Sequence, residues 1–393
     1  MAVIQVSLLV AAVLGVFWRP ARIPNWSVPV ASAVLLVAVG GIGLEAAADS
    51  LHPLLAPLAF LLLAVPLAVL LDRLGFFTSL AALVGRGPHS LLGLWVLAAC
   101  VTTFLNLDAS VVLLTPLYIR IARSRGLDAT IVTLQPVLLA CLASSALPIS
   151  NLTNLIVAEQ RGIGVLGFVV HLGPASLVAV IVGWLGYRRI AHQSVKSEQI
   201  QDPVDPRALR FGTPVVAFVV LGFTLGGAIG IPAWLIALIA DVILLAMTRH
   251  LDLKDFPLGT AALAGGLAVV ATAAAPHLGI GRLIDGSTWL VQLQTAGIAI
   301  VGADTINNLP ALLVSLPAVR QYHELLWPLL FGVNFGPIFI LHGSLAGLLW
   351  RNTASRLDVH VSAWEYTKVG LRVGIPALAA SLATVIATNE LLR

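Results

Sequence analysis

Long apolar segments separated by short polar turns run along the whole chain. They cover residues 3–18, 26–44, 53–71, 130–157, 165–187, 211–228, 232–248, 258–275, 325–350 and 368–391. A helix of about 20 residues crosses the hydrocarbon core of a bilayer, which is roughly 30 Å thick. The pattern therefore predicts ten transmembrane helices.

Two further apolar segments, 90–121 and 290–318, have a length that fits neither one span nor two. The first holds 32 residues, with Asn106 and Asp108 near its centre. A re-entrant hairpin fits this length, because its two short arms enter and leave the membrane on the same face. Backbone can unwind at mid-membrane depth only where protein or water shields it. We expect one such hairpin in each half of the chain.

A polar stretch near the midpoint of the chain, residues 191–209, is expected to be a cytoplasmic linker. On either side of it lie three spans, a hairpin and two spans, and an odd number of spans requires the two halves to be inverted. The expected fold is therefore an all-α polytopic membrane protein with inverted repeats at 1–190 and 210–393. Each repeat contains a broken helix, at about 130–157 and 325–350 respectively. Inverted repeats with broken helices are common in secondary transporters.

The distribution of Lys and Arg favours this topology over one without hairpins. An N-terminus outside the cytoplasm leaves four of the 22 basic residues outside, so 18 lie on the cytoplasmic side, as the positive-inside rule requires. The four are Arg161, Arg282, Arg320 and Arg393. If both hairpins were full spans, Arg120, Arg123 and Arg125 would move to the outer face. We expect a multi-pass protein of the cytoplasmic membrane with both termini outside.

Composition excludes several classes of protein. Hydrophobic residues make up 59% of the chain and charged residues only 10%, which leaves no room for a soluble domain. The net charge of +4 comes from loops beside the spans, so it does not indicate nucleic-acid binding. Cys100 and Cys141 lie in apolar segments without metal-binding spacing, and we expect no metal and no cofactor. The chain has no phosphate-binding loop and is not expected to be an enzyme, although a separate ATPase subunit stays an open alternative.

Polar residues interrupt the predicted broken helices at matching places. Proline removes a helix hydrogen bond, so Pro148 is expected to unwind its helix. The small polar residues after it are Ser150, Asn151, Thr153 and Asn154. In the second half, Gly336 and Pro337 precede His342, Gly343 and Ser344. These residues and those of the hairpin tips are the candidate substrate ligands, although a single Ser, Thr or Asn in a membrane helix is more often an interhelical hydrogen-bonding residue, and the cluster indicates more than its members do.

Asp108 is the candidate for proton or ion coupling. A carboxylate at mid-membrane depth is costly unless it has a partner or a proton, which indicates function. Asp241 and Asp304 are secondary candidates. Asn106, which precedes Asp108 by two residues, has a counterpart in Asn307, because each Asn is followed by a proline ten residues later. This short similarity agrees with a duplicated chain.

These motifs resemble those of the arsenical pump membrane permeases, within the ion transporter superfamily. They are LNLDASVVLLTP at 105–116, ISNLTNL at 149–155, INNLPA at 306–311, GVNFGP at 332–337 and GSLAGLLW at 343–350. The resemblance implies inverted repeats and proton-coupled efflux of arsenite or antimonite. It places Asp108 at the acidic position of the first motif, Asn151 and Asn154 in the second, and the pair Asn307 and Asn308 in the third. Ile340, Leu341 and His342 depart from the polar Thr-Pro that the family usually shows before its second Gly-Ser.

Three transport hypotheses follow. Neutral arsenite and antimonite suit a cavity of hydroxyl and amide groups, with Asp108 carrying the proton. A Na⁺/H⁺ antiporter is the alternative, because Asp108 and nearby carbonyls also supply oxygen ligands for Na⁺. A transporter of carboxylates or other small anions ranks lower, because no Arg or Lys lies in the proposed cavity.

Overall fold

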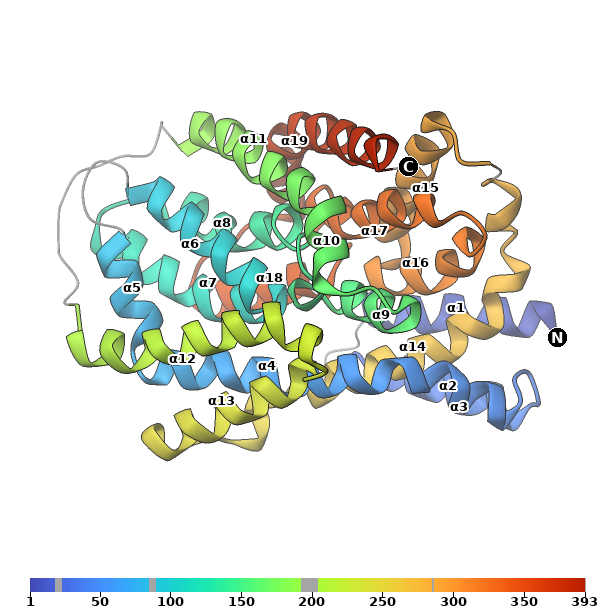
Figure 1. Cartoon of the computed structure of the whole chain (residues 1–393), viewed down its shortest axis with the longest axis horizontal. Coiled ribbons are helices and arrows are strands. Elements are labelled where there is room, and N and C mark those ends of the chain that lie inside the picture. The colour runs from blue at the N-terminus through green and yellow to red at the C-terminus, as the bar shows by residue number, and fades with distance from the viewer. Residues whose placement is uncertain (18–22, 85–89, 192–203, 285, 393) are drawn as a thin grey trace.

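The computed structural model describes residues 1–17, 23–84, 90–191, 204–284 and 286–392, and every regular element within these ranges is a helix (Figure 1). The first half contains α1 (Ala2–Phe17), α2 (Ser27–Ala38), α3 (Leu44–Leu51), α4 (Leu55–Arg73), α5 (Phe76–Val84), α6 (Ser90–Phe104), α7 (Leu107–Ser124), α8 (Ala129–Leu142), α9 (Leu152–Arg161), α10 (Val165–His171) and α11 (Gly173–Ala191). The second half contains α12 (Pro206–Leu225), α13 (Ala233–Thr248), α14 (Leu258–Ala274), α15 (Trp289–Ile306), α16 (Asn308–Ser315), α17 (Leu326–Phe335), α18 (Leu345–Ser355) and α19 (Ala363–Leu391). Short 3₁₀ helices connect them: η1 (His52–Leu54), η2 (Pro148–Ser150), η3 (Gly226–Ile229), η4 (Leu253–Asp255), η5 (Ala275–His277), η6 (Ile280–Arg282), η7 (Leu316–Val319), η8 (His323–Leu325) and η9 (Gly336–Ile338).

Several of these helices are long and apolar enough to cross a membrane without interruption. Within the described ranges they are Leu44–Arg73, Pro206–Leu225, Leu258–His277 and Ala363–Leu391, and α10 with α11, bent by 50°, adds a fifth if the pair forms one span. The expected boundary before residue 53 is wrong, because α3, η1 and α4 run on as one helix of 30 residues. Pro53 lies in the first turn of η1, where a missing N–H does no harm. The chain is thus a polytopic helical membrane protein.

The segments with polar interruptions are divided into pairs of shorter helices. α6 and α7 are separated at residues 105–106, and α15 and α16 at Asn307. The gap between α8 and α9 includes η2, and the gap between α17 and α18 includes η9. We call the connections at 143–151 and 336–344 the first and second break, and the connections at Asn106 and Asn307 the first and second tip. Backbone groups that leave the helix at such gaps must be shielded from lipid by protein or water.

Helices of the two halves pack against each other in reciprocal pairs. α2 of the first half packs on α14 of the second, and α4 packs on α13. α11 and α19 lie side by side along much of their length (Figure 1). Gly186 permits this close approach, because a Cβ atom there would lie 3.2 Å from the Cα atom of Val373. Small residues at helix contacts allow the dense packing on which helix association in membranes depends.

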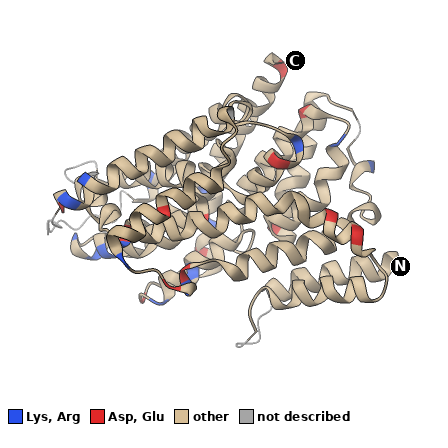
Figure 2. Ribbon diagram, turned by 60° about the horizontal axis from the view of Figure 1, so that its bottom comes forward, with Lys and Arg blue, Asp and Glu red and all other residues tan. Residues whose placement is uncertain are grey.

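Charged residues are concentrated toward the two ends of the molecule. Most of the Lys and Arg residues lie at the end away from the N-terminus (Figure 2). There Arg73, at the end of α4, pairs with Asp255 at 2.8 Å and donates to the carbonyl oxygen of His250 at 2.6 Å, which ties α4 to the α13–α14 connection. Residues 192–203 of the expected linker lie outside the described residues.

Candidate functional site

The candidate site is built from four helix starts, each of which follows a tip or a break. Each start is capped by a side-chain oxygen of the residue before it. Asn106 accepts from the Asp108 N–H at 2.8 Å, and Asn151 accepts from the Thr153 N–H at 3.2 Å. Asn307 accepts from the Leu309 N–H at 3.3 Å, and Ser344 accepts from the Gly347 N–H at 3.2 Å. These residues satisfy backbone donors that a helix start leaves unpaired.

The polar residues after the first break form a cluster centred on Asn334 of α17. The Asn334 Oδ1 atom accepts from Asn151 Nδ2 at 2.9 Å and from Thr153 Oγ1 at 2.6 Å. The Asn334 Nδ2 atom donates to Asn154 Oδ1 at 2.7 Å and to Ser145 Oγ at 3.5 Å. We call these five residues the Asn334 cluster. All five are buried, so the cluster joins the two halves through polar contacts in the interior of the protein.

Asn154 and Ser150 also bind the backbone that the interruptions expose. Asn154 Nδ2 donates to the carbonyl oxygens of Ser144 and Leu147, both at 2.8 Å. Ser150 Oγ donates to the carbonyl oxygen of Thr103, at the end of α6, at 2.9 Å. In this conformation both side chains therefore donate to backbone carbonyl oxygens, which is the structural alternative to substrate binding that the sequence left open.

Each tip contacts the break of its own half in the same way. Asn106 Nδ2 donates to the Ile149 carbonyl oxygen at 3.2 Å, and Asn307 Nδ2 donates to the His342 carbonyl oxygen at 3.5 Å. Each acceptor lies two residues before the residue that caps α9 or α18. The Asn308 N–H adds a 2.9 Å hydrogen bond to the Gly343 carbonyl oxygen. The structure thus brings the predicted residues of each half together at a tip–break contact.

Asp108 lies in the first turn of α7, next to the first tip. The positive end of the α7 dipole favours a negative charge there. Its side chain is half-buried, and within the described residues the carboxylate accepts no hydrogen bond. An unpaired carboxylate of this kind is free to take up a proton or a cation. Asp241 lies elsewhere, in α13, where one buried carboxyl oxygen also has no partner among the described residues.

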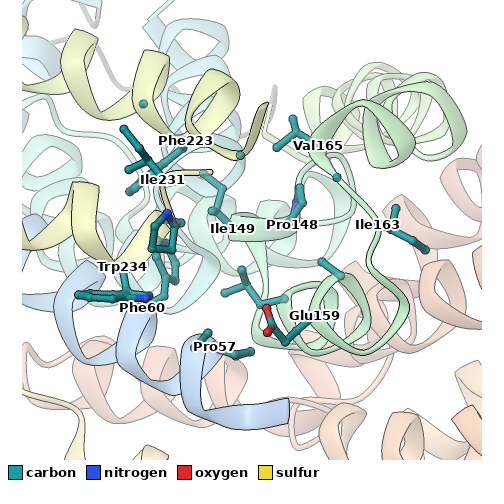
Figure 3. A pocket seen from close by; sticks show the side chains of 18 residues that line it. Pro57, Phe60, Pro148, Ile149, Glu159, Ile163, Val165, Phe223, Ile231 and Trp234 are labelled. Atoms are coloured by element: carbon teal, nitrogen blue, oxygen red, sulfur yellow. The ribbon is translucent and has the colours of Figure 1, made fainter. Parts of the chain in front are cut away.

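A cavity of about 220 Å³ lies beside the first break, and Glu159 of α9 is part of its wall (Figure 3). Its walls come from α4, η2, α9 and the α12–α13 region, and include Phe60, Pro148, Ile149 and Phe223. The carboxylate of Glu159 lies among otherwise apolar labelled side chains in Figure 3. Ile149 lines this cavity and also accepts the hydrogen bond from the first tip through its carbonyl oxygen. It precedes Asn151 of the Asn334 cluster by two residues in the chain.

The second tip stores backbone strain. Asn307 has φ 79° and ψ 151°, a region that residues other than glycine seldom occupy, whereas Asn106 at the first tip has an extended backbone at φ 172°. Such strain costs about 1–3 kcal/mol and is found where surrounding contacts enforce it, often at functional sites.

Replacement of Asn307 should separate strain from capping. Glycine accepts the positive φ and caps nearly as well as Asn. The free energy of unfolding of Asn307→Gly is therefore expected to be about 1–2 kcal/mol higher than that of Asn307→Ala. Thermal unfolding in detergent measures the difference. At Asn106, where φ is extended, the advantage of the Gly variant over the Ala variant should be smaller, because only the difference in capping remains; an equal advantage at the two positions would contradict the assignment of strain.

Asn334 and its partner Ser145 were not among the sequence-predicted ligands, and Asn334 is the centre of the cluster. It lies in the GVNFGP motif, which the sequence assigned to the second half as a family pattern without a role. Within the described residues, no group of three or more His, Cys, Asp or Glu side chains is arranged to hold a metal ion.

Comparison with known proteins finds similar sequences among membrane proteins. A family model described as "Citrate transporter" matches residues 4–335. The arsenical pump membrane protein of Escherichia coli K12 is 25% identical over 355 residues, which cover 81% of this chain and 82% of the relative. The magnetosome protein MamN of Magnetospirillum gryphiswaldense is 26% identical, with 74% of each chain covered. A 46 kDa membrane protein of Mycobacterium leprae is 21% identical, with 81% of this chain and 83% of the relative covered.

Proposed function

Because the chain belongs to the citrate transporter family, we propose that it is a secondary active transporter that exports arsenite and antimonite in exchange for protons. The relatives named as arsenical pump membrane proteins support this choice of substrate. In the proposed cycle, Asp108 takes up a proton from outside and releases it to the cytoplasm, while the substrate moves outward through the same site.

The observation that carries this proposal is that the polar groups of the site include no Lys or Arg side chain. The tips and breaks present amides, hydroxyls and carbonyls, and the stretches 102–110, 143–154, 303–309 and 334–344 contain no Lys or Arg. Arsenite and antimonite are uncharged hydroxides at neutral pH, so hydrogen-bonding groups can bind them without a counter-charge. A carboxylate substrate would lack a cationic partner in these stretches, because buried charges need one. The candidate ligands are Asn106, Ser150, Asn151, Thr153, Asn154, Asn307, Asn308, His342, Gly343 and Ser344.

We also propose that residues 1–190 and 210–393 are inverted repeats with re-entrant hairpins at about 90–121 and 290–318. The equivalent hydrogen bonds from Asn106 and Asn307 support a common origin of the two halves. The reciprocal packing of α2 on α14 and of α4 on α13 supports it as well. Repeats of this kind allow alternating access through exchange of two related conformations.

Transport into everted membrane vesicles tests the function. With an imposed proton gradient, arsenite should accumulate in vesicles that carry the protein and not in vesicles without it. Collapse of the gradient by Na⁺, with no arsenite movement, would assign a Na⁺/H⁺ antiporter instead. Gradient-dependent accumulation of citrate without arsenite would assign a carboxylate transporter.

We propose an orientation with both termini outside the cytoplasmic membrane, which the concentration of basic residues at the opposite end supports (Figure 2). In a variant with Cys100 and Cys141 replaced by Ala, a cysteine at Glu159 should react with a membrane-impermeant maleimide added to intact cells. A cysteine at Lys254, an exposed residue in the α13–α14 connection, should react only in everted vesicles. The reverse labelling pattern would mean that the termini are inside.

A further inference from the structure

The two tip–break contacts define a residue-by-residue correspondence between the halves. Asn106 corresponds to Asn307, since each caps a helix and donates to a break carbonyl. Three residues before each Asn lie Thr103 and Asp304, in the last turns of α6 and α15. The two halves therefore differ at this position, with a hydroxyl in the first and a carboxyl in the second.

The surroundings of the two positions differ in a complementary way. In the first half, the backbone of Thr103 contacts Ser150, the residue before the cap of α9. In the second half, Asp304 contacts Gly343, the residue before the cap of α18: a Cβ atom on Gly343 would lie 3.0 Å from Asp304 Oδ1. Glycine thus leaves room for the larger acidic side chain, where the first half has the hydroxyl of Ser150.

The Asp304 carboxyl has no partner that compensates a permanent negative charge. Its Oδ1 atom is buried and accepts no hydrogen bond from any described residue. A carboxylate oxygen that is buried without a donor or a cation destabilises the ionised form, whereas the protonated form avoids this cost.

The titratable groups that face Asp304 come from two elements, Cys141 of α8 and Tyr366 of α19. His342 precedes Gly343, the residue that lies against Asp304 Oδ1. The Cys141 thiol donates to the Val137 carbonyl oxygen and the Tyr366 hydroxyl to that of Pro337, so both protons are directed elsewhere. α16, α17 and η9 contain no titratable side chain.

Helix dipoles act on Asp304 in opposite directions. Its position in the last turn of α15 disfavours a negative charge, whereas the adjacent start of α18 favours one. The two dipoles oppose each other at Asp304, so a rearrangement at the second break would change their balance. Such rearrangements are what alternating access requires of a broken helix.

We propose that Asp304 is a second proton-binding carboxyl, so that each half of the transporter contributes one: Asp108 at the first tip and Asp304 at the second break. Water supplies and accepts the proton, which binds to a carboxylate oxygen of Asp304. The inference rests on the proton-coupled transport proposed above, but it concerns proton binding, which can be measured without a transported substrate.

Infrared difference spectroscopy of the purified full-length protein between acid and neutral pH tests the proposal. Asp304→Asn should abolish one carboxylic acid C=O band that the wild type shows and that Asp108→Asn retains. Asp304→Thr, which introduces the residue of the corresponding position in the first half, should abolish the same band. The matched control Asp49→Asn removes an exposed carboxyl of α3 and should leave that band in place.

An unchanged difference spectrum in both Asp304 variants would overturn the proposal, because Asp304 would then hold one protonation state throughout. This result would leave the proposed transport of arsenite untouched. Conversely, the wild-type protein could fail to transport arsenite while the Asp304 variants lose the band. That result would contradict only the proposed substrate. If one of the two variants fails to fold, the other still decides the outcome.

Discussion

Asn334→Ala is expected to destabilise the protein by about 2–4 kcal/mol and to abolish transport. Asn334 makes four buried hydrogen bonds, and its removal leaves their partners without replacements. Interhelical hydrogen bonds in membrane proteins contribute about 0.6 kcal/mol on average and up to about 1.7 kcal/mol each, so four bonds of average to moderately higher strength give this range. The loss of transport follows because Asn151 and Asn154 would no longer be held in position against α17.

Thermal unfolding in detergent and transport in vesicles provide the two measurements for Asn334→Ala. The control is Asn352→Ala in α18, which removes an exposed amide of the same type and should change neither quantity. Wild-type stability in Asn334→Ala would show that the Asn334 cluster does not hold the two halves together.

The importance of Asn334 shows where prediction from the sequence reached its limit. The interruption at Pro148 was predictable, because proline and a run of small polar residues act locally on the helix. Asn334 is a single amide in the apolar helix α17, and its partner Thr153 lies 181 positions away in the chain. Only the packing of α9 against α17 gives that amide its role, and no local pattern encodes such a contact.

Helix boundaries show the same division between local and tertiary information. The interruptions at Asn106 and Asn307 lie where polar residues fall within apolar segments, and the sequence identified both positions. The continuity of α3 with α4 was missed, because Glu45 and Asp49 make that region look like a loop. α3 packs on α14, which allows a helix with exposed acidic residues to continue into the apolar span.

Asp108→Asn is expected to lower gradient-driven arsenite transport by roughly 100-fold, the lower range of what a positioned proton-transfer group contributes. The amide keeps the size of the side chain but binds no proton, so an imposed gradient can no longer drive the cycle. Exchange of labelled for unlabelled arsenite across a vesicle without a gradient should continue, because the Asn334 cluster is unchanged. The same variant thus tests coupling and substrate binding separately.

Asp108→Glu is the matched control, since it retains a carboxyl in the first turn of α7 and should preserve part of the gradient-driven rate. Full proton-coupled transport in Asp108→Asn would assign coupling to another group, and loss of exchange as well would make Asp108 a substrate ligand or a structural residue. The location of Asp108 argues for coupling: the start of α7 favours its ionised form, the first tip leaves its carboxylate unpaired, and Asn106 links it directly to the first break. The Asp108 N–H donates to Asn106 Oδ1, and Asn106 Nδ2 donates to the Ile149 carbonyl oxygen, so we expect proton binding at Asp108 to be coupled to rearrangement of the first break.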